Sequence, residues 1–368
     1  MAIGTYIVLA IFLLGRGHAR NASPHISPFE SQPGNVPDNL DDNDFRNNGP
    51  TAAPIKSNYT EVTGWPSEQI SLGEISAVSL DNFGNVVIFH RGNRTWDYYF
   101  DSNYQRKNEG PITQNTIITY DPDSGRIIHR WGANLFFMPH GLTVDEKGNI
   151  FVTDVALNQV FKFPPRGRQG RPSMVLGERF VEGNDKKHFC KPTAVAVAKS
   201  GDFFVADGYC NKRVIKFNSK GEFIFLLGQN PNMVVKSPAP TDFNIPHALA
   251  LAEDKNRVCV ADRENGRIQC FTIDSGIFVS QFAPSEFGKR VYSVAYTPSQ
   301  SGMLFAVNGR DDIVPVRGFA IGFTNQQVTA NFGNLKQPHD VAVSLDGRDV
   351  FIVELDPQKI TKFVDRKL

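Results

Sequence analysis

The stretch "HGLTVDEKGNIFVTDVALNQVFKF", residues 140–163, contains a pattern that recurs along the whole chain. An apolar strand with alternating side chains is followed by a D-x-x-G turn and by a second strand that ends on an acidic residue. A polar loop and a third strand ending in an aromatic residue complete the pattern. Period-two alternation combined with glycine-containing turns predicts antiparallel hairpins.

Five further copies of this pattern lie at residues 76–92, 193–217, 247–271, 292–309 and 339–363. Irregular fourth strands follow some of them, as in "GEFIFLLG" and "GIFVSQF". A four-stranded unit repeated about every 45 to 55 residues is typical of a β-propeller and not of a helical solenoid. We therefore expect an all-β fold, a six-bladed β-propeller, with five or seven blades as the alternatives.

The N-terminal part differs from the repeats. The apolar run Thr5–Leu14 predicts a signal peptide over residues 1–19. It is shorter than the roughly 20 residues that span a bilayer, although a retained anchor remains an alternative. Residues 20–65 are polar and rich in Pro, Asn and Asp, which predicts a disordered leader before a propeller domain at 66–368. Three N-x-S/T sequons, candidate glycosylation sites, begin at Asn21, Asn58 and Asn93.

The chain has 368 residues and a formal net charge of +1. This balance argues against nucleic-acid binding and against a polybasic membrane surface, because both require a dense basic field. No later segment is apolar and long enough to span a bilayer, so no stable membrane span is expected.

Three of the eight histidines share one frame, in "MPHGL", "IPHAL" and "QPHDV". His140, His247 and His339 open the innermost strands of units two, four and six, where a propeller's central channel begins. Three imidazoles with one open side are typical of a catalytic zinc site, although copper, iron and nickel also accept imidazole. The alternative is that each Pro-His starts a strand and fills the channel mouth, but that role does not explain the alternation.

In units one, three and five, the position of the frame histidine is occupied by Ser76, Thr193 and Tyr292. The acid that ends the second strand falls at Asp154, Asp207 and Asp262 in three units. The next position holds Arg91 in unit one and Arg263 in unit four, and Tyr209 lies one step further in unit three. Arginine binds carboxylates through two parallel hydrogen bonds, so the pattern predicts a site for a small anion beside a Lewis acid. In the alternative, the arginines pair with the aspartates and Tyr209 shields a disulfide.

The four cysteines predict two disulfides in an exported chain. Cys259 and Cys270 occupy facing hairpin positions, whereas Cys190 and Cys210 both lie at the rim that carries Tyr209. We therefore expect the pairs Cys190–Cys210 and Cys259–Cys270, with reduced thiols or a metal role as the alternatives.

Several motifs together resemble the lyase domain of the peptidylglycine α-amidating enzyme family, peptidyl-α-hydroxyglycine α-amidating lyase. They are "IFHRGNRTWD", "MPHGLTVD", "FCKPTAVAV", "ADGYCNKRV", "IPHALAL", "ADRENGRIQCF" and "QPHDVAV". The resemblance covers about residues 66 to 365. It implies an NHL-repeat propeller that cleaves peptidyl-α-hydroxyglycine to a peptide amide and glyoxylate. No copper monooxygenase domain precedes these motifs, so we expect a monofunctional lyase.

The resemblance also implies site residues. His140, His247 and His339 would bind zinc. The carbonyls of Val78 and Leu142 and the carboxylate of Asp340 would bind a structural calcium ion. Gln337 stands where the family pattern has methionine, so an apolar wall is not expected there.

The chemistry implied by the resemblance assigns roles to three further residues. Tyr209, with its pKa depressed by Arg91, would act as general base, and zinc-bound hydroxide is the alternative. Arg91 or Arg263 would bind the substrate carboxylate.

The expected substrates are α-hydroxyglycine-extended peptides, processed by a secreted monomer in the secretory pathway, in the granule lumen. A calcium-dependent lactonase or esterase and a non-enzymatic NHL interaction module are the competing hypotheses. Both predict a channel without an imidazole-bound metal.

Overall fold

The structure is a computed structural model that describes residues 58–97, 106–227, 239–311 and 313–367. These residues belong to the unit Ala53–Leu368. The expected signal peptide, the leader up to residue 57 and Asn21 lie outside the described residues. No helix in the described part of the chain is long and apolar enough to cross a membrane.

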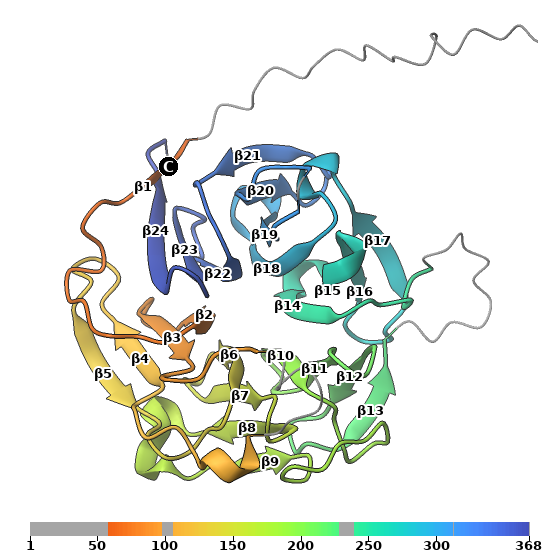
Figure 1. The fold of residues 1–368 in the computed structure, drawn as a ribbon. Helices are drawn as coiled ribbons and strands as arrows, with labels where there is room; N and C mark the ends of the chain where they lie inside the picture. The colour runs from red at the N-terminus through yellow and green to blue at the C-terminus, as the bar shows by residue number, and fades with distance from the viewer. Residues whose placement is uncertain (1–57, 98–105, 228–238, 312, 368) are drawn as a thin grey trace, which may run out of the picture. The chain divides into compact units, whose positions relative to one another are not determined.

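Six four-stranded antiparallel sheets are arranged as blades around a central axis (Figure 1), which confirms the six-bladed propeller. Blade 1 comprises β2 (Ile75–Leu80), β3 (Val86–His90), β4 (Ile117–Tyr120) and β5 (Ile127–Trp131). Blade 2 comprises β6 (Pro139–Val144), β7 (Ile150–Asp154), β8 (Gln159–Phe163) and β9 (Met174–Leu176). Blade 3 comprises β10 (Pro192–Val197), β11 (Phe203–Asp207), β12 (Arg213–Phe217) and β13 (Phe223–Leu226).

Blade 4 comprises β14 (Pro246–Ala252), β15 (Arg257–Asp262), β16 (Arg267–Thr272) and β17 (Phe278–Phe282). Blade 5 comprises β18 (Val291–Thr297), β19 (Met303–Asn308), β20 (Gly318–Gly322) and β21 (Val328–Phe332). Blade 6 comprises β22 (Pro338–Val343), β23 (Asp349–Glu354), β24 (Lys359–Asp365) and β1 (Tyr59–Glu61). The short 3-10 helices are η1 (Lys107–Glu109), η2 (Pro165–Gly170), η3 (Glu253–Lys255), η4 (Arg263–Asn265), η5 (Ser285–Phe287) and η6 (Ser299–Ser301).

The hydrophobic core lies between the blades. Each neighbouring pair of blades shares one cluster of buried side chains, including the closing pair of blade 6 and blade 1. Each sheet is therefore buried on both faces, which explains the near-continuous apolar second strands such as "VVIFH" and "FFVAD". This packing holds the innermost strands in a closed ring around the channel.

Strand β1 closes the ring, because it pairs with β24, the last strand of the chain. It falls within residues 20–65, so the expectation of a disordered leader is wrong for this segment. Tyr59 is buried against Phe305 and Phe332, and its hydroxyl donates to the Gly347 carbonyl at 2.8 Å. A single buried aromatic in a polar stretch is a weak sequence signal, and its partners lie more than 200 residues away.

Replacing Tyr59 tests how much this closure stabilises the fold. Tyr59→Ala should lower the free energy of unfolding by about 3 to 5 kcal/mol, as is usual for a large buried aromatic. Tyr59→Phe keeps the ring contacts and loses only the hydrogen bond, so it should cost about 1 kcal/mol. Urea unfolding of the two variants measures both values. Equal losses would contradict a role of the ring in closing the propeller.

An irregularity recurs at the start of every innermost strand. In all six blades the register with the second strand shifts across the second residue of the innermost strand, which the repeat alignment treats as its opening residue; in blade 2 the shift also includes the next residue, Gly141. The affected positions are Ser76, His140, Thr193, His247, Tyr292 and His339. A bulge turns a side chain away from its normal direction, and here it lies at the channel mouth. The three histidines therefore lie at positions where a bulge changes the direction of the side chain.

Candidate functional site

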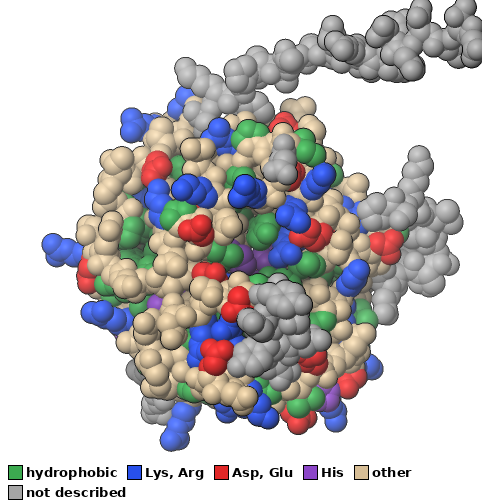
Figure 2. Space-filling model, in the orientation of Figure 1, with side chains coloured by type: hydrophobic (Ala, Val, Ile, Leu, Met, Phe, Trp, Pro, Cys, Tyr) green, Lys and Arg blue, Asp and Glu red, His purple; other side chains and the backbone are tan. Residues whose placement is uncertain are grey.

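The three frame histidines come together at the axis, as their positions in alternate blades predict. One potential ligand atom from each of His140, His247 and His339 lies within 4.8 Å of the others. Their ring centroids are 4.7 to 4.9 Å apart, which forms a nearly equilateral triangle. All three side chains are at most 3% exposed. Figure 2 shows histidine side chains near the centre of the viewed face, beside lysine and arginine side chains.

Each of these rings is fixed by a hydrogen bond to the next blade. The Nδ1 atoms of His140, His247 and His339 lie 2.8, 2.7 and 2.6 Å from main-chain carbonyls. Those carbonyls belong to Thr193, Tyr292 and Ser76, the opening residues of the intervening blades. A carbonyl only accepts, so each Nδ1 carries the proton and each Nε2 keeps its lone pair. A hydrogen bond of this kind at the non-ligating nitrogen orients imidazole as a metal ligand.

The environment also keeps the imidazoles neutral. Burial, together with the positive charge of Arg91, lowers the pKa of His339 to about 3. Burial likewise lowers the pKa of His140 and His247 well below the usual range. Neutral imidazole is the form that binds metal. Three neutral donors with Nε2 lone pairs therefore fit zinc, and no other group of this kind occurs among the described residues.

Tyr209 lies next to these nitrogens. Its hydroxyl is 2.8 Å from His140 Nε2 and 3.3 Å from His247 Nε2. Its ring packs against Trp96, with the ring centroids 4.6 Å apart. Any ion bound by the histidines would therefore have a phenol beside it.

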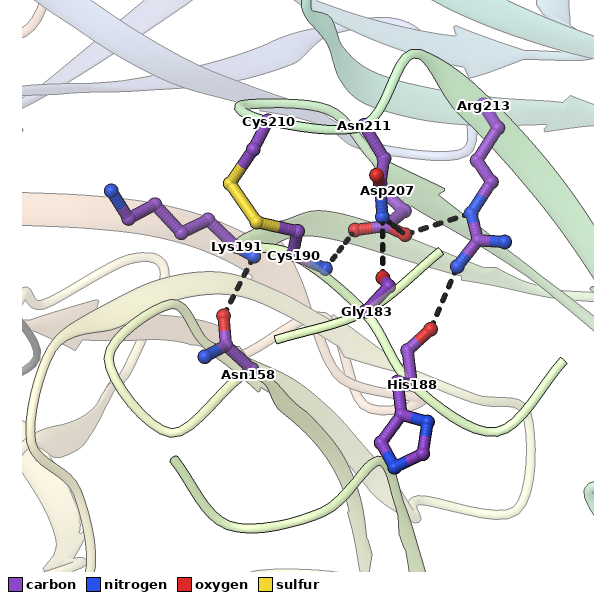
Figure 3. The surroundings of a disulfide bond; sticks show 9 residues. All are labelled: Asn158, Gly183, His188, Cys190, Lys191, Asp207, Cys210, Asn211 and Arg213. Atoms are coloured by element: carbon purple, nitrogen blue, oxygen red, sulfur yellow. Dashed lines mark hydrogen bonds and ion pairs between the residues drawn. A yellow bond between two sulfur atoms is a disulfide. The ribbon is translucent and has the colours of Figure 1, made fainter. Parts of the chain in front are cut away.

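The loop that carries Tyr209 is held on both sides (Figure 3). The disulfide Cys190–Cys210 follows Tyr209 directly, which confirms this pairing. Asp207 precedes it and accepts hydrogen bonds from the Cys190 amide at 2.8 Å and from Arg213 Nε at 2.9 Å. Shielding the disulfide and facing the histidines are therefore not exclusive alternatives for Tyr209.

The second expected disulfide, Cys259–Cys270, is also present. These cysteines are direct cross-strand partners on β15 and β16, and both are fully buried. The structure thus confirms both expected pairs.

Arg91 is completely buried at the same rim. Its Nη1 lies 2.5 Å from Glu74 Oε2, and its Nε donates to the Pro139 carbonyl at 3.0 Å. Its Nη2 has no hydrogen-bond partner in the described structure. Because a buried unpaired donor is costly, this atom is a candidate contact for a substrate acceptor.

Arg263 also lies beside Tyr209. Its guanidinium carbon is 5.4 Å from the centroid of the Tyr209 ring and 5.0 Å from that of Tyr292. Its Nε donates to Glu264 at 2.9 Å. A positive charge over an aromatic ring is stabilised by the ring and favours negative charge on the phenol oxygen.

The arginines do not pair with the aspartates that end the second strands. Asp154 accepts from four main-chain amides, those of Phe137, Met138, Ala156 and Leu157. Asp207 and Asp262 pair with Arg213 and Arg267 instead. These aspartates therefore have a structural role, and both site arginines pair with glutamates.

Sequence reasoning missed Glu74 and Trp96. Glu74 binds Arg91 and accepts from the Trp96 amide at 3.2 Å. The guanidinium of Arg91 lies 5.2 Å from the Trp96 ring. Trp96 belongs to the motif "IFHRGNRTWD", and this motif could have identified it as a site residue. Glu74 lies before the first repeat, and no sequence motif marks it.

A cavity of about 1450 Å³ opens over this rim, and we call it the basic mouth. Its lining includes Arg91, Trp96, Tyr209, Arg263 and His339. Gln337 also lines it and is exposed, whereas the equivalent Met138 is fully buried.

A second cavity of about 1020 Å³ reaches the histidines from the other end of the channel, and we call it the acidic mouth. Val78, Leu142 and Asp340, the residues that the resemblance assigns to calcium, all line it. Asp340 accepts from the Val78 amide at 2.9 Å and from the Ser293 hydroxyl at 2.5 Å. Burial raises the pKa of Asp340 to about 6.

The remaining histidines and sequons have simpler surroundings. His90 is buried, and its Nδ1 accepts from the amides of Gly73 and Gly92, so it has a packing role. Asn93 is exposed and Asn58 is half-buried.

Comparison with known proteins shows related sequences along most of the chain. The NHL repeat model matches residues 189–217 and 243–271. Peptidyl-alpha-hydroxyglycine alpha-amidating lyase 1 of Drosophila melanogaster is 46% identical over 86% of this chain and 61% of its own length. Lyase 2 of the same organism is 40% identical over 80% of this chain and 71% of its own length.

Among solved structures, hydrazine synthase of Kuenenia stuttgartiensis is similar, with a TM-score of 0.54 at 12% identity over 83% of this chain and 80% of that chain. That likeness concerns the fold alone. The extent of identity to the lyases, together with the histidine triangle and the aromatic and arginine residues around it, supports one conclusion about ancestry: the chain belongs to the peptidyl-α-hydroxyglycine α-amidating lyase family.

Proposed function

We propose that the protein cleaves peptidyl-α-hydroxyglycine to a peptide α-amide and glyoxylate at the histidine triangle. The observation that carries this proposal is the three buried Nε2 lone pairs beside one phenol and two guanidiniums. Such a site can hold a metal, a base and a carboxylate-binding group together. The substrate carries the matching groups, an α-hydroxyl and a terminal carboxylate.

Arg91 is the better candidate for binding the substrate carboxylate. Arg91 lines the basic mouth, its Nη2 is an unpaired buried donor, and its Nη1 pairs with Glu74. Arg263 instead lies close to two phenol rings, those of Tyr209 and Tyr292. There its charge supports the ionised form of Tyr209.

The three histidines would hold zinc through their Nε2 atoms. When bound, zinc supplies Lewis acidity that lowers the pKa of the substrate hydroxyl. The Tyr209 phenolate takes the hydroxyl proton, and the C–O bond becomes the aldehyde carbonyl as the C–N bond breaks. The electron pair of that bond goes to the amide nitrogen, and Tyr209 returns the proton there. The products are the peptide amide and glyoxylate, and the enzyme is restored.

A glyoxylate assay on α-hydroxyhippurate tests the proposal. Purified protein should release glyoxylate and benzamide in equal amounts, and a strong chelator should abolish the release. Stoichiometric zinc in the active protein is expected by elemental analysis. Protein that contains calcium alone would favour the lactonase hypothesis, and protein without bound metal would favour an interaction module.

We also propose that calcium binds at the acidic mouth through Asp340 and the carbonyls of Val78 and Leu142. Asp340 is a half-buried carboxylate that cross-links blades 6, 1 and 5 through its contacts with Val78 and Ser293. A hard cation with oxygen ligands suits this position. Its charge would offset the cost of keeping Asp340 ionised.

Replacing the Asp340 carboxylate tests whether it binds calcium. At neutral pH, calcium should raise the melting temperature of the wild-type protein, because it binds the folded state only. Asp340→Asn keeps an accepting oxygen but loses the charge, so calcium should no longer shift its melting temperature. Asp121→Asn, at an exposed turn of blade 1, is the matched control and should respond as the wild type does. A full calcium response in Asp340→Asn would contradict the site.

Two disulfides among the described residues are typical of proteins that fold in an oxidising compartment. They support secretion, with the granule lumen as the proposed destination. Glycans at Asn58 and Asn93, a monomeric state, and α-hydroxyglycine-extended peptides as substrates complete the proposal. Glycosidase treatment and sedimentation of the secreted protein test the first two.

A further inference from the structure

The two mouths of the channel carry opposite charge. The acidic mouth is lined by carboxylates and by no lysine or arginine of the described residues. Its acids are Asp81, Asp145, Glu146, Asp340, Asp346 and Asp349. The basic mouth is lined by Arg91, Lys191, Arg263, Lys289, Arg290 and Arg310, against three acids. An ion approaching the histidines therefore meets opposite fields at the two ends.

Four of the six carboxylates form no ion pair in the described part of the chain, namely Asp340 and the three turn residues below. Glu146 pairs with Lys199 and Asp349 pairs with Lys362. Asp81, Asp145 and Asp346 form no ion pair in the described part of the chain, and they accept hydrogen bonds from main-chain amides of their own turns. These turns follow the innermost strands of blades 1, 2 and 6. The same three blades supply Val78, Leu142 and Asp340.

The histidines connect the two cavities. All three line the acidic mouth, and His339 also lines the basic mouth. His339 Nε2 has no hydrogen-bond partner within the described ranges, although the side chain is only 3% exposed. A cation that travels up the acidic mouth thus reaches unshared nitrogen lone pairs without passing the arginines.

We propose that the acidic mouth is the route by which divalent cations enter the channel, steered by Asp81, Asp145 and Asp346, while the basic mouth admits the anionic substrate. This inference rests on the metal site of the proposed function. Carboxylates around a narrow opening focus the field and raise the local concentration of cations. Separate entrances let the site be loaded with metal from one side and with substrate from the other.

Metal uptake by the metal-free full chain tests this route directly. Co²⁺ bound to imidazoles absorbs visible light, so stopped-flow absorbance measures its rate of uptake without any enzyme assay. The combined variant Asp81→Asn, Asp145→Asn, Asp346→Asn keeps an accepting oxygen for each turn amide and removes the charges. Its uptake rate constant should be about tenfold smaller at low salt. The difference should shrink at high salt, and the final cobalt stoichiometry should be unchanged.

Asp311→Asn is the matched control. Asp311 also caps turn amides, those of Lys289, Ile313 and Val314, but it lies at the basic mouth. Its substitution should not slow cobalt uptake. The single variant Asp145→Asn, expected to slow uptake about two- to threefold, covers the case in which the combined variant does not fold.

The outcomes separate the two proposals. Unchanged uptake in the folded Asp145→Asn and combined variants, or equal slowing by Asp311→Asn, would overturn the route and leave the metal site intact. A wild-type protein that binds no cobalt would overturn the metal site and the route together.

Discussion

His247→Ala is expected to abolish glyoxylate release, with a loss of more than about 100-fold, while the propeller stays folded. Weakening a residue that only supports a metal ligand typically costs 10- to 100-fold, so removing a ligand itself should cost more. His247 projects into the channel and lies outside the clusters between the blades. The substitution removes the hydrogen bond to the Tyr292 carbonyl and the longer one with the Tyr209 hydroxyl, which should lower the free energy of unfolding by only about 1 to 2 kcal/mol.

Turnover and bound zinc should be measured on the same preparation of His247→Ala. His129→Ala is the control, because His129 lies on the outermost strand of blade 1 and, within the described ranges, hydrogen-bonds only with the Arg166 carbonyl. Its turnover and zinc content should match those of the wild type. Near-normal turnover of His247→Ala would remove His247 from the metal site and, with it, the proposed arrangement of donors.

The blade pattern could be derived from sequence because it depends on local signals. Alternating strands and glycine turns repeat along the chain, so a partly irregular copy such as 292–309 could be aligned with stronger ones. The histidines followed from the same alignment, since equal positions in equal blades face the same axis. The disulfides could be paired because hairpin register places Cys259 opposite Cys270.

Other features could not be derived because they depend on contacts between distant segments. Strand β1 is too short and polar to be recognised without its partner β24. The acid that pairs with Arg91 lies outside the repeat, at Glu74, so the alignment of repeats offered only the aspartates as alternative partners. The bulge at each opening residue is a backbone irregularity shared by serine, threonine, tyrosine and histidine, and therefore has no residue signature.

The charge difference between the two mouths could be derived from sequence only in part. The three steering acids of the acidic mouth are ordinary turn residues. In the sequence, the hydrogen bonds that each one makes within its own turn are enough to explain its presence. Only their gathering around one opening, at the end of the channel opposite the arginines, suggests a second role. A residue can thus satisfy a local structural rule and still contribute to the field of a site.

Tyr209→Phe is expected to lower kcat by about 10²- to 10⁴-fold, the usual contribution of a general base. The substitution removes only the hydroxyl that lies 2.8 Å from His140 Nε2. The ring contacts with Trp96 and Arg263 do not involve that oxygen, so the walls of the site should persist. Bound zinc should equal that of the wild type, which separates this variant from His247→Ala.

Tyr292→Phe provides the comparison, because it removes a second phenol near the same histidines. The Tyr292 ring lies 5.3 Å from the His247 ring, but its hydroxyl makes no hydrogen bond to a histidine in the described structure. It should therefore lose much less activity than Tyr209→Phe. If the two variants lose activity equally, or if Tyr209→Phe turns over normally, Tyr209 does not transfer the proton. In that case it serves as a wall beside the metal, and the base is some other group within reach of the substrate hydroxyl.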